Sequence, residues 1–318
     1  MGIEKKMGLA TRDAYGKTLV ELGKENPSIV VLDADLSKST KTEMFGKAFP
    51  ERFIDCGIVE MNMVGVASGL ALSGKTVFVS SFACFIVCKT YDQLRMSVAN
   101  PLADVKIVAS HGGISIGEDG ASQQSIEDVA LITSLPGFTV IIPADQYSTS
   151  SLVRQAARIK GPFYIRTGRP KVPVIYHENS HFSVGKGVQL VEGKDVTIIA
   201  NGLLVFEALA AAHELKDSGI SAAVIDMHTV KPLDRDLVRE ACLKTGAIVT
   251  AEEHQVWGGL GSAVAQAVAQ THPVPMELIG INDVYAESGK AEELMEKYGL
   301  TSMNIVKAVK KVIQRKKS

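Results

Sequence analysis

The sequence predicts an α/β fold with two domains and mostly parallel sheets. The chain has 318 residues, a length that suits two domains because one domain commonly has about 100–200 residues. Short, continuous apolar runs recur along it, and such runs are typical of strands that are buried on both faces of a sheet. Segments with helical character separate the runs. Strands that alternate with helices indicate strand–helix–strand units and therefore parallel sheets.

The first domain is expected over residues 1–175. Its strands are predicted at the apolar runs 29–32, 76–79, 105–109, 139–142 and 163–165. Its helices are predicted over residues 11–25, 60–72 and 146–157. Pro170, Pro173 and the polar stretch that follows them favour an irregular connection, so a linker is expected over residues 176–190.

The second domain is expected over residues 191–318 and repeats the same alternation on a smaller scale. Its strands are predicted at 196–200, 221–225 and 247–251, and its helices at 204–218 and 261–270.

Composition excludes several classes of protein. The 34 Lys and Arg residues nearly cancel the 35 Asp and Glu residues, so the basic excess of a nucleic-acid-binding protein is missing. The four cysteines have neither disulfide-scaffold density nor the spacing of zinc ligands. Apolar stretches end well short of a membrane span, and the N-terminal residues lack the apolar core of a secretory signal. We therefore expect a cytoplasmic protein that binds neither nucleic acid nor membranes.

The chemistry of the protein is expected in the first domain. Ligand sites of open α/β sheets lie beyond the carboxyl ends of the strands. In the first domain the segments near these ends carry polar or aromatic side chains: 33–39, 56–60, 80–85, 111–120 and 166–169. The corresponding segments of the second domain, 201–202 and 252–254, are less varied.

Glu60 stands directly before a thoroughly apolar helical segment. An acid at a helix start is often there only because it interacts favourably with the helix dipole. A half-buried glutamate at such a place would instead have its acid form favoured, which suits the transfer of a proton. The sequence alone leaves both interpretations open.

Phe82 and Phe85 leave two interpretations open as well. They follow a buried strand, where aromatic residues serve either as core or as a wall that stacks on a flat heteroaromatic ring. The glycine-rich stretch 112–120 lacks the ending of a P-loop and is weak evidence of phosphate binding by itself.

Taken together, seven segments resemble a known family. In chain order they are Ala10-Thr11-Arg12, Asp33-Ala34-Asp35-Leu36, Gly57 to Met63, Phe82 with Phe85, His111 with Gly117 to Gly120, Pro143-Ala144-Asp145 and Ile165-Arg166. In this order and spacing they resemble the second half of transketolase, which is its pyrimidine-binding domain followed by its C-terminal domain. The resemblance covers essentially the whole chain and implies these two folds for the two predicted domains.

The resemblance also implies thiamine diphosphate as the cofactor. It makes Glu60 a catalytic residue that hydrogen-bonds the aminopyrimidine ring of the cofactor, and it places Phe82 and Phe85 in stacking contact with that ring. Asp35 matches an acid near the cofactor. The reaction implied is transfer of a two-carbon ketol unit from a ketose phosphate to an aldose phosphate, in which the cofactor supplies the electron sink.

Substrate contacts are implied for a further group of residues. His111, the second catalytic residue, and Asp119 match residues that hydrogen-bond sugar hydroxyls. Arg12, Ser39 and Arg166 match the anchors of the sugar phosphate, and a guanidinium fork suits a phosphate dianion.

Two departures from the family pattern stand out. Gln123 occupies a position at which many transketolases have histidine, and glutamine can act neither as acid nor as base. The Gly-Asp-Gly and Asn pattern that holds Mg²⁺ and diphosphate in the first half of transketolase is not found, so no metal ligand is predicted in this chain. We therefore expect one subunit of a split transketolase, with an N-terminal partner subunit that binds Mg²⁺, in a two-plus-two heterotetramer.

Other functions remain open at this point. The beta subunit of a 2-oxo acid dehydrogenase and a 1-deoxyxylulose-5-phosphate synthase-like protein share the pyrimidine domain and its glutamate. The segment 33–36 and the phosphate anchors favour transketolase. A non-catalytic regulatory homologue would have no need of Glu60, His111 and Asp119.

Overall fold

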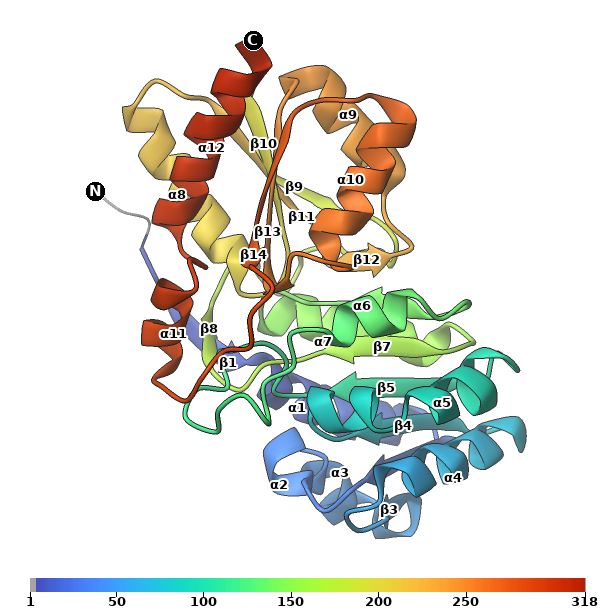
Figure 1. Cartoon of the computed structure of the whole chain (residues 1–318). Helices are drawn as coiled ribbons and strands as arrows, with labels where there is room; N and C mark the ends of the chain where they lie inside the picture. The colour runs from blue at the N-terminus through green and yellow to red at the C-terminus, as the bar shows by residue number, and fades with distance from the viewer. Residues whose placement is uncertain (1–3, 318) are drawn as a thin grey trace.

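A seven-stranded sheet forms the centre of the first domain in the computed structural model, which describes residues 4–317 (Figure 1). Residues 1–3 and 318, at the outer limits of the two predicted domains, lie outside the described residues. The strand order is β12-β6-β7-β5-β4-β2-β3. The strands are β2 (Ile29–Asp33), β3 (Phe53–Asp55), β4 (Thr76–Ser80), β5 (Val105–Ala109), β6 (Thr139–Ile141), β7 (Phe163–Arg166) and β12 (Thr229–Lys231). Neighbours from β6 to β3 are parallel, and β12 pairs antiparallel with β6.

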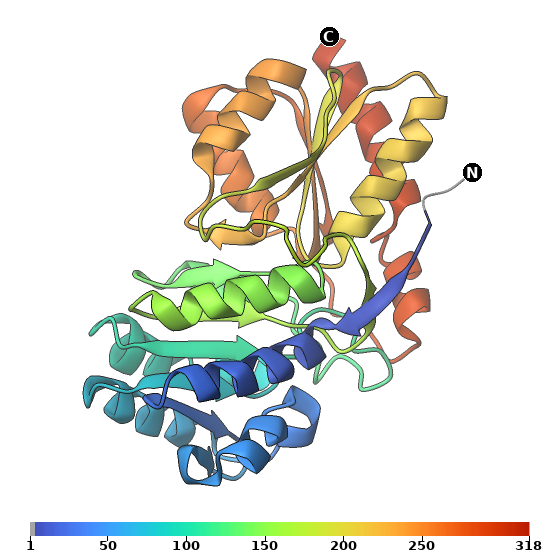
Figure 2. The same cartoon turned by 180° about the vertical axis from the view of Figure 1, so that it is seen from behind.

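Helices cover both faces of this sheet (Figures 1 and 2). One face carries α1 (Thr11–Glu25), α3 (Glu43–Ala48) and α7 (Gln146–Arg158); the other carries α4 (Glu60–Leu72), the π-helix η3 (Leu94–Ala99) and α6 (Asp128–Thr133). Shorter helical turns are α2 (Ser37–Thr40), η1 (Pro50–Arg52), the π-turn η2 (Cys84–Cys88) and α5 (Tyr91–Gln93).

The two covered faces explain why the strands are continuous apolar runs. In β2, Leu32 packs in the core on the α4 side, whereas Val31 packs in the core on the α1 side. In β4, Val79 packs in the core on the α4 side and Phe78 in the core on the α1 side. Side chains of a strand point alternately to opposite faces, so every position must be apolar when both faces are buried.

The second domain contains a five-stranded sheet with the order β14-β13-β10-β11-β9. Its strands are β9 (Val188–Val191), β10 (Val196–Ala200), β11 (Ala222–Asp226), β13 (Ile248–Gln255) and β14 (Met276–Ile281), of which β9 alone runs antiparallel to its neighbour. Helices α8 (Leu204–Asp217) and α12 (Ser302–Lys317) lie on one face, and α9 (Arg235–Thr245) and α10 (Leu260–Thr271) on the other (Figure 1). Helix α11 (Ala291–Lys297) lies beside the first domain.

The predicted α/β fold with two domains and mostly parallel sheets is confirmed by this architecture. Several elements carried no usable signal in the sequence. Strand β3 has only three residues, two of them exposed, and is too short to show a period. Strand β12 comes from the second domain but completes the sheet of the first, a long-range pairing that local sequence patterns do not report.

The connection between the domains is held to both of them. Strand β8 (Lys171–Pro173) pairs antiparallel with β1 (Met7–Ala10). Farther along, the Tyr176 amide donates to a carboxylate oxygen of Asp145 in the first domain, and its hydroxyl donates to Asp226 in the second, at 2.9 and 2.7 Å.

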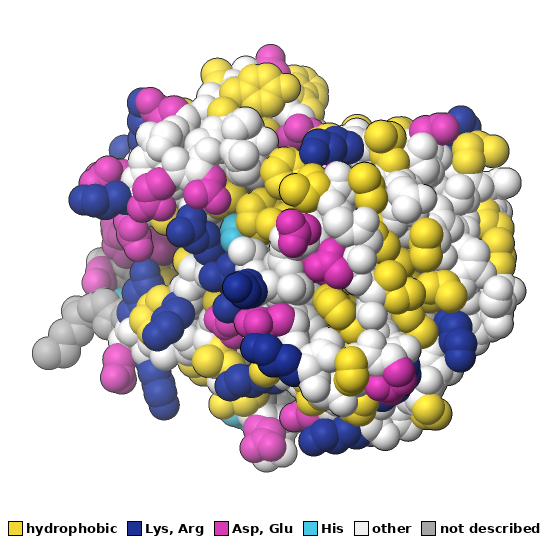
Figure 3. Space-filling view, turned by 90° about the horizontal axis from the view of Figure 1, so that it is seen from below, with side chains coloured by type: hydrophobic (Ala, Val, Ile, Leu, Met, Phe, Trp, Pro, Cys, Tyr) yellow, Lys and Arg dark blue, Asp and Glu magenta, His cyan; other side chains and the backbone are white. Residues whose placement is uncertain are grey.

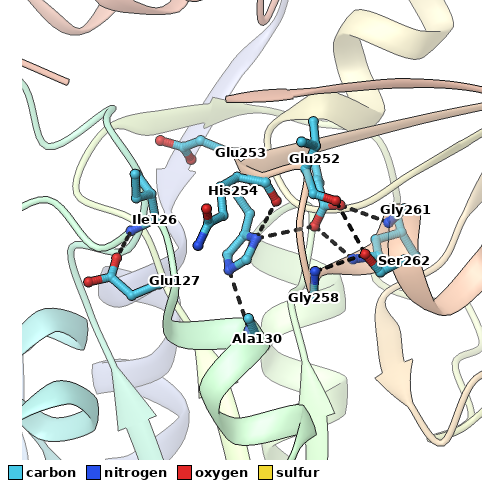
Figure 4. Close-up of polar contacts among 12 residues, drawn as sticks. Ile126, Glu127, Ala130, Glu252, Glu253, His254, Gly258, Gly261 and Ser262 are labelled. Atoms are coloured by element: carbon cyan, nitrogen blue, oxygen red, sulfur yellow. Dashed lines mark hydrogen bonds and ion pairs between the residues drawn. The ribbon is translucent and has the colours of Figure 1, made fainter. Parts of the chain in front are cut away.

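A buried polar contact joins α6 to the end of β13 (Figure 4). The amide of Ala130 lies 3.4 Å from Nε2 of His254, and Nδ1 of this histidine lies 2.7 Å from the carbonyl oxygen of Gln255. Glu252 accepts hydrogen bonds from the amides of Leu260 and Gly261 at the start of α10, at 2.7 Å each. The Ala130–His254 contact joins the carboxyl end of the second sheet to the first domain, and the Glu252 bonds hold the start of α10 at that end.

Among residues 4–317, no helix is both long and apolar enough to cross a membrane.

Candidate active site

Glu60 is the first residue of α4 and is buried, with 5% of its surface exposed. Its carboxylate lies 3.6 Å from the ammonium of Lys89. The same ammonium lies 4.4 Å from the centre of the Phe85 ring, in a cation–π contact. Lys89 therefore connects the buried glutamate to the aromatic segment that follows β4.

Phe82 and Phe85 form a stacked pair. Their ring centres are 5.6 Å apart and the ring planes differ by 11°. The backbone of Phe82 is held in place because it pairs with that of Ser110 in an isolated parallel β-bridge, beyond the ends of β4 and β5. The imidazole of His111 stacks on Phe82 with 3.8 Å between ring centres, so one face of Phe82 is already covered, and Phe85 is the less buried ring of the two.

His111 is held from several sides. Its backbone has φ +60°, a left-handed conformation that is uncommon outside glycine. Its Nδ1 lies 2.7 Å from the Ser110 hydroxyl, and its Nε2 lies 3.2 Å from a guanidinium nitrogen of Arg12. Burial, reinforced by the positive charges of Arg12, Arg169 and Lys41, lowers the pKa of His111 to about 3. The imidazole is therefore neutral at physiological pH.

Positive side chains gather around His111. Arg12 also donates to the carbonyl oxygen of Ser39 at 3.0 Å, which places the α2 turn beside the histidine. Arg169 donates to the carbonyl oxygen of Ile116 at 2.6 Å and lies 3.6 Å from the Asp119 carboxylate. An anionic substrate group at this place would meet more than one cation.

Arg166 does not belong to this cluster. It is buried, with 5% of its surface exposed, and each of its guanidinium nitrogens already faces a partner within the chain. Nε lies 3.1 Å from the Asp128 carboxylate, and the other two donate to the carbonyl oxygens of Glu253 and Ser125 at 2.8 Å. The expectation that Arg166 anchors a phosphate needs correction, because this guanidinium is used to join the two domains.

Arg169 is better placed than Arg166 to contact an anionic ligand. Reasoning from the sequence missed it. It is half-exposed, at 39% of its side-chain surface, whereas Arg166 is the last residue of a strand whose four positions are all buried. The position of each arginine relative to the strand end could have distinguished them in the sequence. A side chain just beyond the end of a strand that is buried on both faces can reach a ligand, whereas a side chain within the strand cannot.

Asp35 lies apart from the contacts that link the other predicted residues. It is exposed, in the turn after β2, with φ +59°. The neighbouring Asp33 is the buried acid: its carboxylate accepts hydrogen bonds from Leu36, Thr40 and Thr42. Burial raises the pKa of Asp33 to about 6. Asp33 thus shapes the turn that carries Asp35 and Ser39.

The residues around Glu60 fit a flat heteroaromatic ring with a hydrogen-bonding edge. Phe82 and Phe85 offer parallel rings, and Glu60 offers a buried carboxylate near them.

Among the described residues, no group of three or more His, Cys, Asp or Glu side chains is arranged to hold a metal ion. The thiols of Cys84 and Cys88 are poor nucleophiles, since burial raises the pKa of each to about 12.

Comparison with known families agrees with this arrangement. The family described as transketolase, pyrimidine binding domain, matches residues 7–174, and the transketolase C-terminal domain family matches residues 185–305.

Individual relatives point to the same family. The chain is 48% identical to a Methanocaldococcus jannaschii protein described as a transketolase C-terminal section, over 94% of each chain. It is 43% identical to a 6-deoxy-6-sulfo-D-fructose transketolase subunit of a Clostridium species, over 96% of this chain and 95% of that one. It is 41% identical to human transketolase, of which it covers 49%.

Among solved structures, a split-gene transketolase described as an inactive beta4 tetramer superposes with a TM-score of 0.92. It is 52% identical, and the match covers 97% of this chain and 100% of that chain. The protein belongs to the transketolase family and contains the pyrimidine-binding and C-terminal domains of that family, as found in the C-terminal subunit of a split transketolase.

Proposed function

We propose that this chain is the C-terminal subunit of a thiamine diphosphate-dependent transketolase. The assembled enzyme would transfer a two-carbon ketol unit from a ketose phosphate to an aldose phosphate. One observation carries the proposal: an unbroken series of contacts runs from Glu60 through Lys89, Phe85, Phe82 and His111 to Arg12. Side chains suited to a cofactor ring and side chains suited to an anion are thus neighbours in one series of contacts.

The cofactor half of the site is assigned to Glu60, Phe82 and Phe85. Bound thiamine diphosphate would supply the electron sink for breaking and forming the carbon–carbon bond. The Glu60 carboxyl group would exchange a proton with the edge of the pyrimidine ring as a general acid–base contact. The aromatic pair would orient the ring. Asp35 is retained as a proposed cofactor contact from the family pattern alone.

The substrate half of the site is assigned to His111, Asp119, Arg12, Ser39 and Arg169. Arginine forks bind phosphate dianions through paired hydrogen bonds. The phosphate of the sugar would lie between Arg12 and Arg169, in place of the earlier assignment to Arg166. His111 and Asp119 would contact the sugar hydroxyls.

A partner subunit is proposed to complete the site. The outward face of α4 exposes Met61 and Leu72, and a side-chain carbon added at Gly65 or Gly69 would meet no atom of the chain. In the view from below, hydrophobic side chains gather on the side where α4 lies (Figure 3). Exposed apolar side chains that gather on one face are typical of an interface.

The partner would be an N-terminal transketolase subunit that binds Mg²⁺ and the diphosphate of the cofactor. The description of the split-gene relative supports partner dependence, because the beta4 tetramer of that protein is called inactive. We further propose a two-plus-two heterotetramer, a cytoplasmic location, and domain limits at 1–175 and 191–318 with a linker over 176–190.

The test is reconstitution. The purified chain alone should show no ketol transfer, and adding the partner chain, thiamine diphosphate and Mg²⁺ should restore transfer together with a larger assembly by light scattering. Full activity of the chain alone would contradict the dependence on a partner. Turnover of a 2-oxo acid without turnover of sugar phosphates would favour the dehydrogenase alternative.

A further inference from the structure

Ser110 and His111 are neighbours at the carboxyl end of β5, and both are buried, with 1% and 3% of their surfaces exposed. The Ser110 hydroxyl lies 2.7 Å from Nδ1 of His111. On the other side of the ring, an Arg12 nitrogen lies 3.2 Å from Nε2. Both ring nitrogens therefore have a partner within the chain.

The chemistry of Arg12 decides which nitrogen carries the proton. Guanidinium nitrogens can only donate, and arginine does not lose its proton in proteins. Nε2 must therefore present its lone pair to Arg12. Because the ring is neutral and has one proton, that proton lies on Nδ1, and the Ser110 hydroxyl accepts it.

We propose that Arg12 fixes His111 as the Nδ1-protonated tautomer, with Nε2 as a hydrogen-bond acceptor, and that Ser110 is a positioning residue that holds the ring by accepting the Nδ1 proton. This inference rests on the proposed function for its consequence. In this tautomer the single lone pair of Nε2 can accept a hydrogen bond, from Arg12 as here or from a substrate hydroxyl that takes the place of Arg12, but Nε2 cannot donate one to a carbonyl oxygen. His111 would therefore select for a hydroxyl group on the sugar.

The backbone around Ser110 leaves the pair little freedom. The Ser110 amide donates to the carbonyl oxygen of Ser81, and the Ser110 carbonyl accepts from the amide of Ala83, at 3.0 and 2.8 Å. Stacking on Phe82 restricts the imidazole plane. With ring and backbone both held, the Ser110 hydroxyl stays within reach of Nδ1 as the acceptor of its proton.

The chain offers a matched control. Ser81 is also fully buried, lies beside Ser110 across this backbone hydrogen bond, and has a hydroxyl with no hydrogen-bond partner among the described residues. Ser81→Ala removes the same atom without touching His111.

The experiment uses ¹⁵N-histidine-labelled full-length chain, whose seven histidines include one signal that His111→Gln removes. The nitrogen shifts of that signal should show a protonated Nδ1 and an unprotonated Nε2. Arg12→Met removes the donor at Nε2 and should mix the tautomers, and Ser81→Ala should leave the single tautomer unchanged. Ser110→Ala should keep Nδ1 protonated but shift its resonance, because the acceptor is lost, and Ser110→Thr should reverse that shift. A wild-type signal with protonated Nε2, an unchanged tautomer in Arg12→Met, or an Nδ1 resonance that Ser110→Ala does not shift would overturn the proposal.

Kinetics of the assembled enzyme give the second measurement. Ser110→Ala should lower kcat/KM about 3- to 10-fold, in the range expected for one lost hydrogen bond, and Ser81→Ala should stay within about twofold. Equal losses in both variants would indicate general disturbance of this strand end and would overturn the specific role. If the assembled wild-type enzyme transfers no ketol unit, the proposed function fails, while the nitrogen shifts still decide the tautomer.

Discussion

The Lys89 ammonium lies 3.6 Å from the Glu60 carboxylate, and the two side chains differ greatly in exposure, at 51% and 6%. The Lys89 ammonium is half in water and stays hydrated when it moves away, so separating it from the buried carboxylate costs less than separating a fully buried pair. Glu60 therefore meets a displaceable cation at the place where a cofactor ring would bind.

Replacing Glu60 should abolish most activity without unfolding the protein. Glu60→Gln keeps the size of the side chain but removes its charge, and loss of a general acid–base contact costs at least about 100-fold in turnover. The measurement is kcat of the assembled enzyme at saturating cofactor. Glu43→Gln is the control, because Glu43 is also the first residue of a helix and pairs with a lysine, Lys47, at 2.8 Å. Near-wild-type turnover of Glu60→Gln would remove Glu60 from the mechanism.

Removing Lys89 should have a small effect. Lys89→Met keeps the aliphatic stem over Phe85 and deletes the ammonium, so we expect kcat to change by less than about fivefold, corresponding to about 1 kcal/mol. The apparent cofactor affinity and kcat are measured together. A loss as large as that of Glu60→Gln would show that the ammonium takes part in the reaction.

Substitutions of Arg166, the last residue of β7, and of Arg169, which follows the strand, should have different effects. Arg169→Ala should raise the KM for phosphorylated sugars about 10- to 150-fold, as expected for a lost charged hydrogen bond of about 1.5–3 kcal/mol, and should barely change turnover of an unphosphorylated analogue. Arg166→Ala should instead lower stability by about 3–5 kcal/mol, because it leaves the buried Asp128 carboxylate without its cation. Steady-state kinetics and thermal unfolding separate the two outcomes. The opposite pattern would restore Arg166 as the phosphate anchor.

A charge on the outward face of α4 should prevent assembly. Met61 is 56% exposed, and Met61→Glu would place a carboxylate in the proposed apolar interface, where an unpaired charge is costly. Light scattering of the mixture with the partner chain should show a smaller species. Met303→Glu, at a methionine of similar exposure on α12, should assemble normally; assembly of both variants would place the interface elsewhere.

Asp226 should make stability depend on pH. Burial raises the pKa of Asp226 to about 7, while an unfolded aspartate has a pKa of about 3.9. Between these values the folded state binds more protons, so this group lowers the stability of the folded state as pH rises from about 4 to about 7.

Asp226→Asn keeps an acceptor for the Tyr176 hydroxyl and removes this ionisation. Its melting temperature relative to wild type should therefore increase steadily from about pH 4 to pH 7. The exposed Asp217→Asn is the control. Parallel profiles for Asp226→Asn and wild type would show that the carboxyl does not change protonation in this range.

The sequence alone determined the α/β class, because strands covered on both faces must be apolar at every position, and β2 and β4 show this directly. It also pointed to Glu60, Phe82 and His111, since these residues follow strands or start a helix, positions that can be located from local patterns. Tertiary structure alone decided how they are used. Arg166 and Arg169 are equally basic in sequence, but packing between the domains buries one beside Asp128 and leaves the other near Asp119. The protonation state of His111 likewise depends on Arg12, which is distant in sequence and close in space, because electrostatic and hydrogen-bonding interactions depend on distance between atoms and not on separation along the chain.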